Sequence, residues 1–301
     1  MASVLVAGGT GFIGRHIVRS LVARGHRVAV MSRDPRRAAQ VVPEGVEVRP
    51  GDVRQPETLR EAMAGVEVVV SAVQFPNHPV ENPRKGYTYL AIDGEGTVRQ
   101  VEAARAAGVR RFVYLSGAGT REGRTEPWFQ AKLKAEKAIR ESGMTYTIFR
   151  PSWVYGPEDR SLNRFAAFAR HLPFVPVIGD GRIRVQPVLV TDLAQVVALS
   201  VDAPQAENKI YDVGGPEALT MNEILQTMLK VMGLRRPLLH GPVPLVKAAA
   251  AVLSLLPNPP LTPRAVDFIL MDEPVDIGPL LRDFPIRLTP LEEGLSYLAR
   301  H

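Results

Sequence analysis

The chain has 301 residues, with 37 Lys and Arg against 31 Asp and Glu, so its formal net charge is +6. Hydrophobic residues make up 46% and charged residues 23%, which is typical of a folded globular protein and argues against disorder. The chain contains no cysteine, which excludes disulfides, thiolate metal sites and cysteine nucleophiles, and we expect no metal. The positive surplus is too small to indicate binding to nucleic acid.

No apolar run reaches the length of about 18 residues that a membrane span needs. The first residues, Met1 to Val4, lead directly into a strand-like run, which leaves no room for a signal peptide. We therefore expect a cytoplasmic protein, with peripheral contact to the inner face of the membrane as the alternative.

The first half of the chain alternates short apolar runs with helical patterns, which predicts a doubly wound parallel α/β sheet. Strands are expected at residues 4–7, 28–31, 46–48, 66–72, 111–115 and 145–149, and helices at 12–24, 87–107 and 128–142. The Pro- and Asn-containing segment 74–86 is expected to be a loop.

Prolines cluster after residue 150, and the predicted elements become shorter. We therefore expect a main domain over residues 1–155 and a smaller C-terminal lobe over 156–301, with residues 185–215 returning to the main sheet. The segment Val243 to Leu256 is strongly apolar, broken only by Lys247 and Ser254. It predicts a core helix of the lobe, and a contact with a partner or a membrane surface is the alternative, because the segment is too short to span a bilayer.

The motif with the clearest chemistry is a glycine series directly after the first strand. Gly8, Gly11 and Gly14 follow the spacing G-x-x-G-x-x-G, and an amphipathic helix begins at once. Gly8 permits a tight turn, Gly11 allows a close approach to a pyrophosphate, and Gly14 lets the helix pack on the sheet. The helix N-terminus offers N–H groups to phosphates. The pattern predicts a dinucleotide site that includes the intervening residues Thr10, Phe12 and Ile13.

The end of the second strand indicates which dinucleotide binds. NAD sites place a carboxylate there, whereas NADP sites need positive charge for the 2′-phosphate. Ser32 stands where the acid is expected and Arg33 follows it, which favours NADP(H) over NAD(H). Asp34 remains an alternative ligand of the ribose if the strand ends later.

Further cofactor contacts are expected where the next strands end. Asp52 and Val53 follow the third strand, where they face the adenine, although an Asp there equally suits a helix cap. Ser71, Ala72 and Val73 end the fourth strand near the ribose. We also expect Pro151, at the end of the sixth strand, to contact the cofactor.

Several motifs together resemble the extended and atypical short-chain dehydrogenase/reductases. Beside the glycine series, these are Gly51-Asp52-Val53, Tyr114-Leu115-Ser116, Arg150-Pro151-Ser152-Trp153-Val154-Tyr155-Gly156-Pro157, Val190-Thr191-Asp192-Leu193-Ala194 and Tyr211-Asp212-Val213-Gly214-Gly215. The resemblance is strongest to bacterial relatives of the nucleotide-binding accessory subunit of respiratory complex I, with NmrA-like proteins next. It implies a Rossmann domain that holds NAD(P) and a small lobe that closes over a substrate.

The family's chemistry implies a Tyr-x-x-x-Lys pair on one helix, in which the Lys holds the nicotinamide ribose and the Tyr transfers a proton. Lys132 matches the Lys, but Trp128 replaces the Tyr, and an indole cannot act as an acid or base near neutral pH. The alternative for Lys132 is an exposed lysine paired with Glu136. The family's Ser or Thr aligns with Gly117, and a slip of one residue restores Ser116.

Other proton donors are weaker candidates. Tyr155, Tyr87 and Tyr89 stand near predicted strand ends, and His78 lies in the loop after the fourth strand, where a solvated histidine is the simpler expectation.

Three functions follow from this pattern. The first is an NADPH-dependent reductase of a quinone-like or other apolar acceptor, which needs little acid catalysis and which an apolar lobe with Phe165, Phe168 and Phe174 would suit. The second is a non-catalytic NADPH-binding sensor, or a structural or assembly partner of a respiratory complex. A sugar-nucleotide epimerase or dehydratase is less favoured, because those reactions depend on the missing tyrosine.

Overall fold

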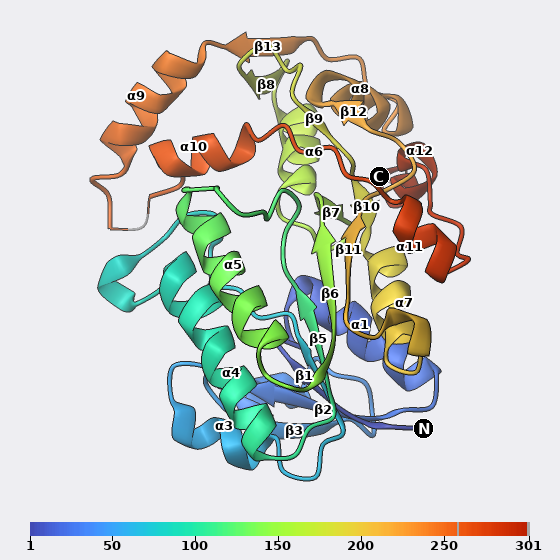
Figure 1. Cartoon of the computed structure of the whole chain (residues 1–301). Helices are drawn as coiled ribbons and strands as arrows, with labels where there is room; N and C mark the ends of the chain where they lie inside the picture. The colour runs from blue at the N-terminus through green and yellow to red at the C-terminus, as the bar shows by residue number, and fades with distance from the viewer. Residues whose placement is uncertain (258, 300–301) are drawn as a thin grey trace.

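A computed structural model describes residues 1–257 and 259–299 and contains a central parallel sheet of seven strands (Figure 1). Their spatial order is β11-β6-β5-β4-β1-β2-β3, so the direction of winding reverses between β1 and β4. The strands are β1 (Ser3–Ala7), β2 (Arg27–Ser32), β3 (Glu47–Pro50), β4 (Val68–Ser71), β5 (Arg111–Leu115), β6 (Thr145–Pro151) and β11 (Lys209–Val213). Because all pairs are parallel, every carboxyl end lies at one edge of the sheet.

The sheet is covered on both faces, and its central strands β1, β4 and β5 are mostly apolar and almost entirely buried. Alternate residues of β1 enter different cores: Val4 and Val6 face α1 (Phe12–Ala23) and α7 (Val190–Ser200), whereas Leu5 and Ala7 face the opposite layer. That layer consists of α3 (Pro56–Ala62), α4 (Glu95–Ala106) and α5 (Pro127–Arg140). The doubly wound fold predicted from the alternation of strands and helices is therefore confirmed.

The later part of the chain adds a third hydrophobic core beyond the carboxyl edge of the sheet (Figure 1). It is built around α6 (Leu162–His171) and α8 (Met221–Val231) and includes Tyr155 and Leu295. Three two-stranded sheets border it: β7 (Val154–Tyr155) with β10 (Val188–Leu189), β9 (Arg184–Val185) with β12 (Leu219–Thr220), and β8 (Val175–Ile178) with β13 (Leu238–Gly241). The boundary at residue 155 stays a prediction, and residues 258, 300 and 301 of that lobe lie outside the described residues.

Two elements differ from the sequence-based expectation. The helix predicted over 87–107 begins as a π-helix, η2 (Tyr89–Gly94), before α4 continues it. The apolar segment 243–256 is not a core helix: α9 (Val243–Leu253) buries only Ala250 completely, and Leu245 and Val252 are about two-thirds exposed. One side of α9 packs against α10 (Pro263–Ile269). The opposite side of α9 remains exposed. No described helix has both the length and the apolar character needed to cross a membrane.

A buried arginine connects the start of β5 to the end of α7. Arg111 is 6% exposed, and its Nη1 donates to the carbonyl oxygens of Ser200 (2.6 Å) and Val201 (2.8 Å). Its other terminal nitrogen pairs with Glu207. These acceptors are the last carbonyls of a helix, which a cation stabilises.

We expect Arg111→Met to lower the free energy of unfolding by about 3 kcal/mol, because it leaves buried carbonyls and Glu207 without their partner. Arg110→Met is the matched control, since Arg110 is the adjacent, exposed arginine and should change stability by less than about 0.5 kcal/mol. Urea unfolding of both variants measures the difference. If both variants lost the same free energy of unfolding, the buried hydrogen bonds of Arg111 would contribute nothing to stability.

Candidate functional site

The glycine-rich turn between β1 and α1 leaves no room for side chains. Gly8 has a φ of 81°, and a Cβ there would stand 2.6 Å from the carbonyl oxygen of Ala72 at the end of β4. A Cβ on Gly14 would stand 2.1 Å from the carbonyl oxygen of Gly8. The first turn of α1 therefore rests directly on the backbone that leaves β1, at the point where the sheet reverses its order.

The N-terminus of α1 is arranged to receive an anion. Gly11 is its N-cap residue and offers no side chain to the first-turn N–H groups, which include those of Phe12 and Ile13, and the first turn contains no acidic residue. Arg15 lies in the next turn, and its Nη2 donates to the carbonyl oxygen of Thr10 at 3.2 Å. Backbone N–H groups and the helix dipole favour a diphosphate at this end, so the residues present fit a dinucleotide.

Cations and one carboxylate gather where β2 and β3 end. The Asp52 carboxylate is held by Arg54 through both oxygens, with a shortest contact of 2.7 Å. Burial opposes the charge on Asp52, but the hydrogen bonds and charge of Arg54 outweigh it and keep the pKa of Asp52 below its ordinary value. The guanidinium groups of Arg33 and Arg54 lie 6.0 and 5.4 Å from the ring centre of Tyr87. Asp52, the expected adenine ligand, is therefore already paired.

Asp34, the alternative ribose ligand, has a local structural role. Its Oδ1 accepts from the Arg37 N–H at 3.1 Å, which caps the short helix α2 (Pro35–Ala39). The Ser32 hydroxyl donates to the Asp34 carbonyl oxygen and accepts from its N–H. The carboxylate is thus engaged in the α2 cap, while Arg33 is exposed beside it.

The three residues expected to contact the cofactor at the end of β4, Ser71, Ala72 and Val73, lie in different surroundings. The Ser71 hydroxyl is fully buried and donates to Gln100 of α4 at 3.1 Å, so it faces the helix layer. Ala72 and Val73 are half-buried and continue the strand beyond its end. Val53 is buried and packs against Gly96, where a Cβ would stand 2.9 Å from its methyl group.

Lys132 is buried in an ion pair that the sequence did not indicate. Its Nζ lies 3.1 Å from Oδ1 of Asp93, whose side chain is fully buried, and donates to the carbonyl oxygen of Leu115 at 3.3 Å. Its Nζ also lies 5.2 Å from the ring centre of Tyr114. The lysine thus lies at the carboxyl end of β5. The alternative for Lys132, an exposed lysine paired with Glu136, is therefore wrong.

Electrostatics keep this lysine charged. Burial disfavours the ammonium, but the Tyr114 hydroxyl and the Asp93 carboxylate outweigh it and raise the pKa of Lys132. Burial also raises the pKa of Asp93 above that of an exposed carboxyl, and the lysine charge opposes this. The π-helical turn η2 delivers Asp93 to this position, since a π-turn redirects the side chains that an α-helix would present.

Ser116 and Glu136 belong to a second buried network. The Ser116 hydroxyl donates to Glu136 at 2.6 Å, and Arg150 binds the same carboxylate at 2.9 and 2.6 Å. The hydroxyl expected to orient a substrate is thus committed to this ion pair. Pro151 ends β6 nearby, and its carbonyl oxygen accepts from Ala118 N–H at 2.9 Å.

Aromatic rings surround the position where the family has its tyrosine. The group, here called the aromatic cluster, comprises Phe75, His78, Tyr89, Trp128 and Phe268. Phe268 comes from α10 and meets Trp128 edge-on, with ring centres 5.5 Å apart, and meets His78 at 4.7 Å. Trp128 is 8% exposed, and its Nε1–H has no hydrogen-bond partner among the described residues. Five rings from four segments therefore form one largely buried apolar cluster.

None of the alternative proton donors is suited to that task. His78 packs against three rings, not in solvent as expected; burial, with a smaller effect from Lys132, lowers its pKa to about 3. Burial raises the pKa of Tyr89 and of Tyr155. Tyr155 lies in the third core, directly under Gly294, and Tyr87 lies beside Arg33.

Sequence reasoning missed Asp93, Tyr114, Phe75 and Phe268. Asp93 had a signal, since it is a single acid that follows the apolar residues Leu90, Ala91 and Ile92 in a predicted helix. Phe268 had no such signal, because its contact with the aromatic cluster depends on how the C-terminal lobe folds back over the main domain. Phe165 and Phe168, expected to suit a ligand, contact one another on α6, and Phe165 packs on the third core.

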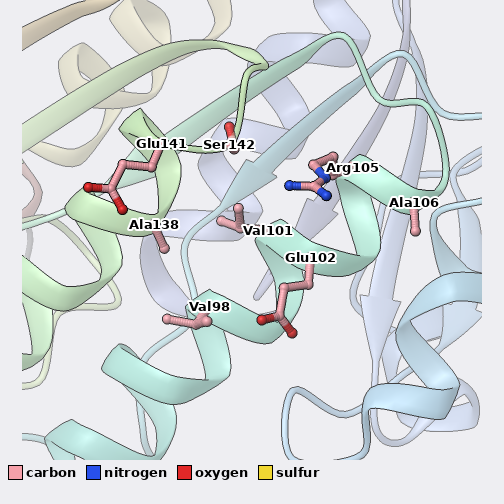
Figure 2. Close-up of a pocket in the computed structure, with 8 residues that line it drawn as sticks. All are labelled: Val98, Val101, Glu102, Arg105, Ala106, Ala138, Glu141 and Ser142. Carbon is pink, nitrogen blue, oxygen red and sulfur yellow. The ribbon is translucent and has the colours of Figure 1, made fainter.

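Two surface hollows lie outside the glycine-rich turn. One of about 470 Å³ lies between the C-terminal halves of α4 and α5, and Figure 2 shows residues such as Glu102, Arg105 and Glu141 around it. It lies toward the amino ends of the strands, away from all the residues above. The other, of about 440 Å³, lies between the start of α5 and α10, and Trp128, Asp267 and Met271 line it.

Known proteins agree with this geometry. The model of a family described as NAD(P)H-binding matches residues 8–174. Ceramide reductase of Caulobacter vibrioides is 31% identical over 262 residues, which cover 85% of this chain and 80% of that protein. Subunit 9 of the alpha subcomplex of mitochondrial NADH dehydrogenase from Arabidopsis thaliana is 28% identical over 260 residues, which cover 84% of this chain. The match spans 63% of that subunit, less than two thirds of its length.

Among solved structures, triphenylmethane reductase of Citrobacter sp. in complex with NADP(H) superposes with a TM-score of 0.74. It is 26% identical, and the match covers 98% of this chain and 99% of that one. The strand order, the glycine-rich turn and the family match over more than half of the chain all lead to the same conclusion. This chain belongs to the NAD(P)H-binding family, with the Rossmann fold of the short-chain dehydrogenase/reductases that its motifs predicted.

Proposed function

We propose that this protein is an NADPH-dependent reductase of a quinone-like or other flat, apolar acceptor. The observation that carries the proposal is the aromatic cluster, which stands where an acid–base tyrosine would be, directly beside buried Lys132. Bound NADPH supplies a hydride, and a proton from water completes the reduction, giving the hydroquinone and NADP⁺. The similar triphenylmethane reductase of Citrobacter sp., whose name gives a triphenylmethane as its substrate, supports a bulky aromatic acceptor.

The chain's own residues would position the two reactants. The N–H groups at the start of α1 would hold the diphosphate, and the Lys132 ammonium would hold the nicotinamide ribose while Asp93 fixes its position. The aromatic cluster would stack on the acceptor and exclude water. No group of the cluster titrates near neutral pH, since His78 and Tyr89 are shifted in opposite directions away from it.

The preference for NADPH rests on Arg33. Its exposed guanidinium stands at the end of β2 where a 2′-phosphate would lie, with Arg54 nearby, while the Asp34 carboxylate is occupied in a helix cap. A planar guanidinium binds phosphate through two N–H groups.

We expect Arg33→Gln to raise the Kd for NADPH about tenfold, because one charge-assisted hydrogen bond is lost, and to leave the Kd for NADH nearly unchanged. Arg36→Gln, a nearby exposed arginine in α2, is the control and should change neither constant. Calorimetric titration with both dinucleotides measures the effect. Tighter binding of NADH than NADPH by the unaltered protein would contradict the preference.

A second prediction concerns Trp128 and the acceptor. In stopped-flow experiments, we expect a panel of quinones to oxidise bound NADPH. The rate should change little between about pH 6 and about pH 8, because no residue of the aromatic cluster titrates in that range. Trp128→Phe should retain most of the rate, since the indole N–H has no role. Trp128→Ala should raise the acceptor KM about tenfold through lost stacking.

The same experiment distinguishes the second candidate function. The likeness to a subunit of NADH dehydrogenase and the missing tyrosine favour a non-catalytic sensor or assembly partner of a respiratory complex. Normal binding of NADPH without oxidation by any acceptor would support that function and reject the reductase. Gain of alcohol dehydrogenation by Trp128→Tyr would show that Lys132 and the ribose are correctly placed.

A third prediction follows from the neutral state of His78. Between pH 6.5 and about pH 3 the unfolded chain binds a proton at this residue and the folded chain does not, so stability falls as the pH drops through this range. We expect a loss of up to about 2 kcal/mol between about pH 7 and about pH 5 that His78→Phe removes. His171→Phe, at an exposed position on α6, is the control in urea unfolding at both pH values. An unchanged pH dependence in His78→Phe would show that His78 is charged in the folded protein.

A further inference from the structure

One surface of the lobe is apolar although it is exposed. Leu245 is 67% exposed, Val252 68%, Leu255 85% and Leu256 50%. Leu239 of β13, just before α9, is 55% exposed. Single exposed apolar residues are common on protein surfaces, but here five large ones occur close together in the sequence. A patch of this kind indicates an interaction site.

Most of the exposed apolar residues of α9 follow helical spacing and share one side, which the turn after the helix continues. The set, here called the apolar stripe, is Leu245, Ala248, Ala249 and Val252 of α9, with Leu255 and Leu256 of the following turn. The inner side, with Val243, Val246 and buried Ala250, packs against α10 and the adjacent ends of β8 and β13. Figure 1 shows α9 at the outer edge of the lobe, with α10 on its inner side. The stripe is thus directed outward by a helix already anchored on its other side.

The segment that carries the stripe is basic in sequence, and acids from other segments balance part of its charge. The sequence from Ile224 to Val266 contains no Asp or Glu, whereas it contains Lys230, Arg235, Arg236, Lys247 and Arg264. Within the described residues, three of these cations pair with acids from other segments, namely Glu292, Asp267 and Glu81. Arg235 is exposed, and Arg236 donates to the carbonyl oxygen of Ala169, so both keep their charge beside β13.

We propose that the apolar stripe and Leu239 dock on an anionic phospholipid surface. Helices that lie in a membrane interface combine an apolar side of this kind with flanking Lys and Arg, and insert by about 5–10 Å. The proposal does not depend on the reductase function, because it concerns a different surface and its test measures binding.

The composition and size of the stripe favour lipid over protein. It consists of Leu, Val and Ala, whereas the centres of protein interfaces are enriched in aromatic residues, Met and Arg and depleted in Ala. With 11 residues, α9 is about 16 Å long, and the stripe and Leu239 together expose on the order of 500 Å² of apolar surface. A stable dimer buries about 800 Å² on each partner, so a second copy would not be held by this stripe alone.

The test is co-sedimentation of the full chain with vesicles. We expect binding to vesicles that contain phosphatidylglycerol and little binding to phosphatidylcholine alone. The triple variant Leu245→Gln, Val252→Gln, Leu255→Gln should partition at least about tenfold more weakly, because three exposed apolar groups no longer enter the lipid. Leu90→Gln is the matched control, since Leu90 is 53% exposed on η2, and it should bind as the unaltered protein does.

A second variant keeps the test valid if the triple variant fails to fold. Arg235→Gln removes one exposed charge and should weaken binding to the anionic vesicles about fivefold. Absence of binding to either vesicle by the unaltered protein would overturn the proposal. So would a dimer in analytical ultracentrifugation that the triple variant converts to a monomer, since the occupant would then be a second copy.

Discussion

The close contact between Gly8 and the first turn of α1 is the constraint on which the site depends. Because Gly14 has no Cβ, the helix starts directly on the carbonyl of Gly8, at the edge of the sheet where the strand order reverses between β1 and β4. Any side chain at Gly14 would meet backbone atoms, which cannot move aside as a flexible side chain can. The same turn therefore determines the packing of the domain and, in the function proposed above, would also position the diphosphate.

From that point the site diverges from the usual chemistry of its superfamily. An ammonium persists at Lys132, whose side chain is 12% exposed, because Asp93 lies 3.1 Å away, and a charge so largely removed from water would be unstable without such a partner. The residue four positions earlier has exchanged a titratable phenol for an indole, which contributes area and no proton. If the protein is the reductase proposed above, Lys132 would still position the ribose, while an apolar ring stands where the family has its proton-transferring tyrosine. Such a reaction would depend on positioning of the reactants and exclusion of water.

The sequence predicted those parts of the structure that depend on local pattern. The buried strands, the helix from Phe12 and the glycine-rich turn all have short-range signals, and the structure has each of them. The role of α9 was predicted wrongly, because an apolar helix is compatible with either a core or an exposed interface, and only the neighbouring elements decide which. The roles of Ser71 and Ser116 also depended on neighbours: each hydroxyl faces a buried partner, Gln100 or Glu136, that lies far away in sequence.

The aromatic cluster shows why distant contacts carry so much of the function here. Its rings come from the loop after β4, from η2 and α5, and from α10, near the end of the chain. Since α10 packs on α9, the ring of Phe268 and the apolar stripe belong to one continuous hairpin. Glu273, just beyond α10, binds Arg124, and Arg264 at its start binds Glu81, so ion pairs fix both ends of α10 to the main domain. The exposed side of α9 and the ring of Phe268 beside Trp128 are therefore joined through α10, which these ion pairs hold against the main domain.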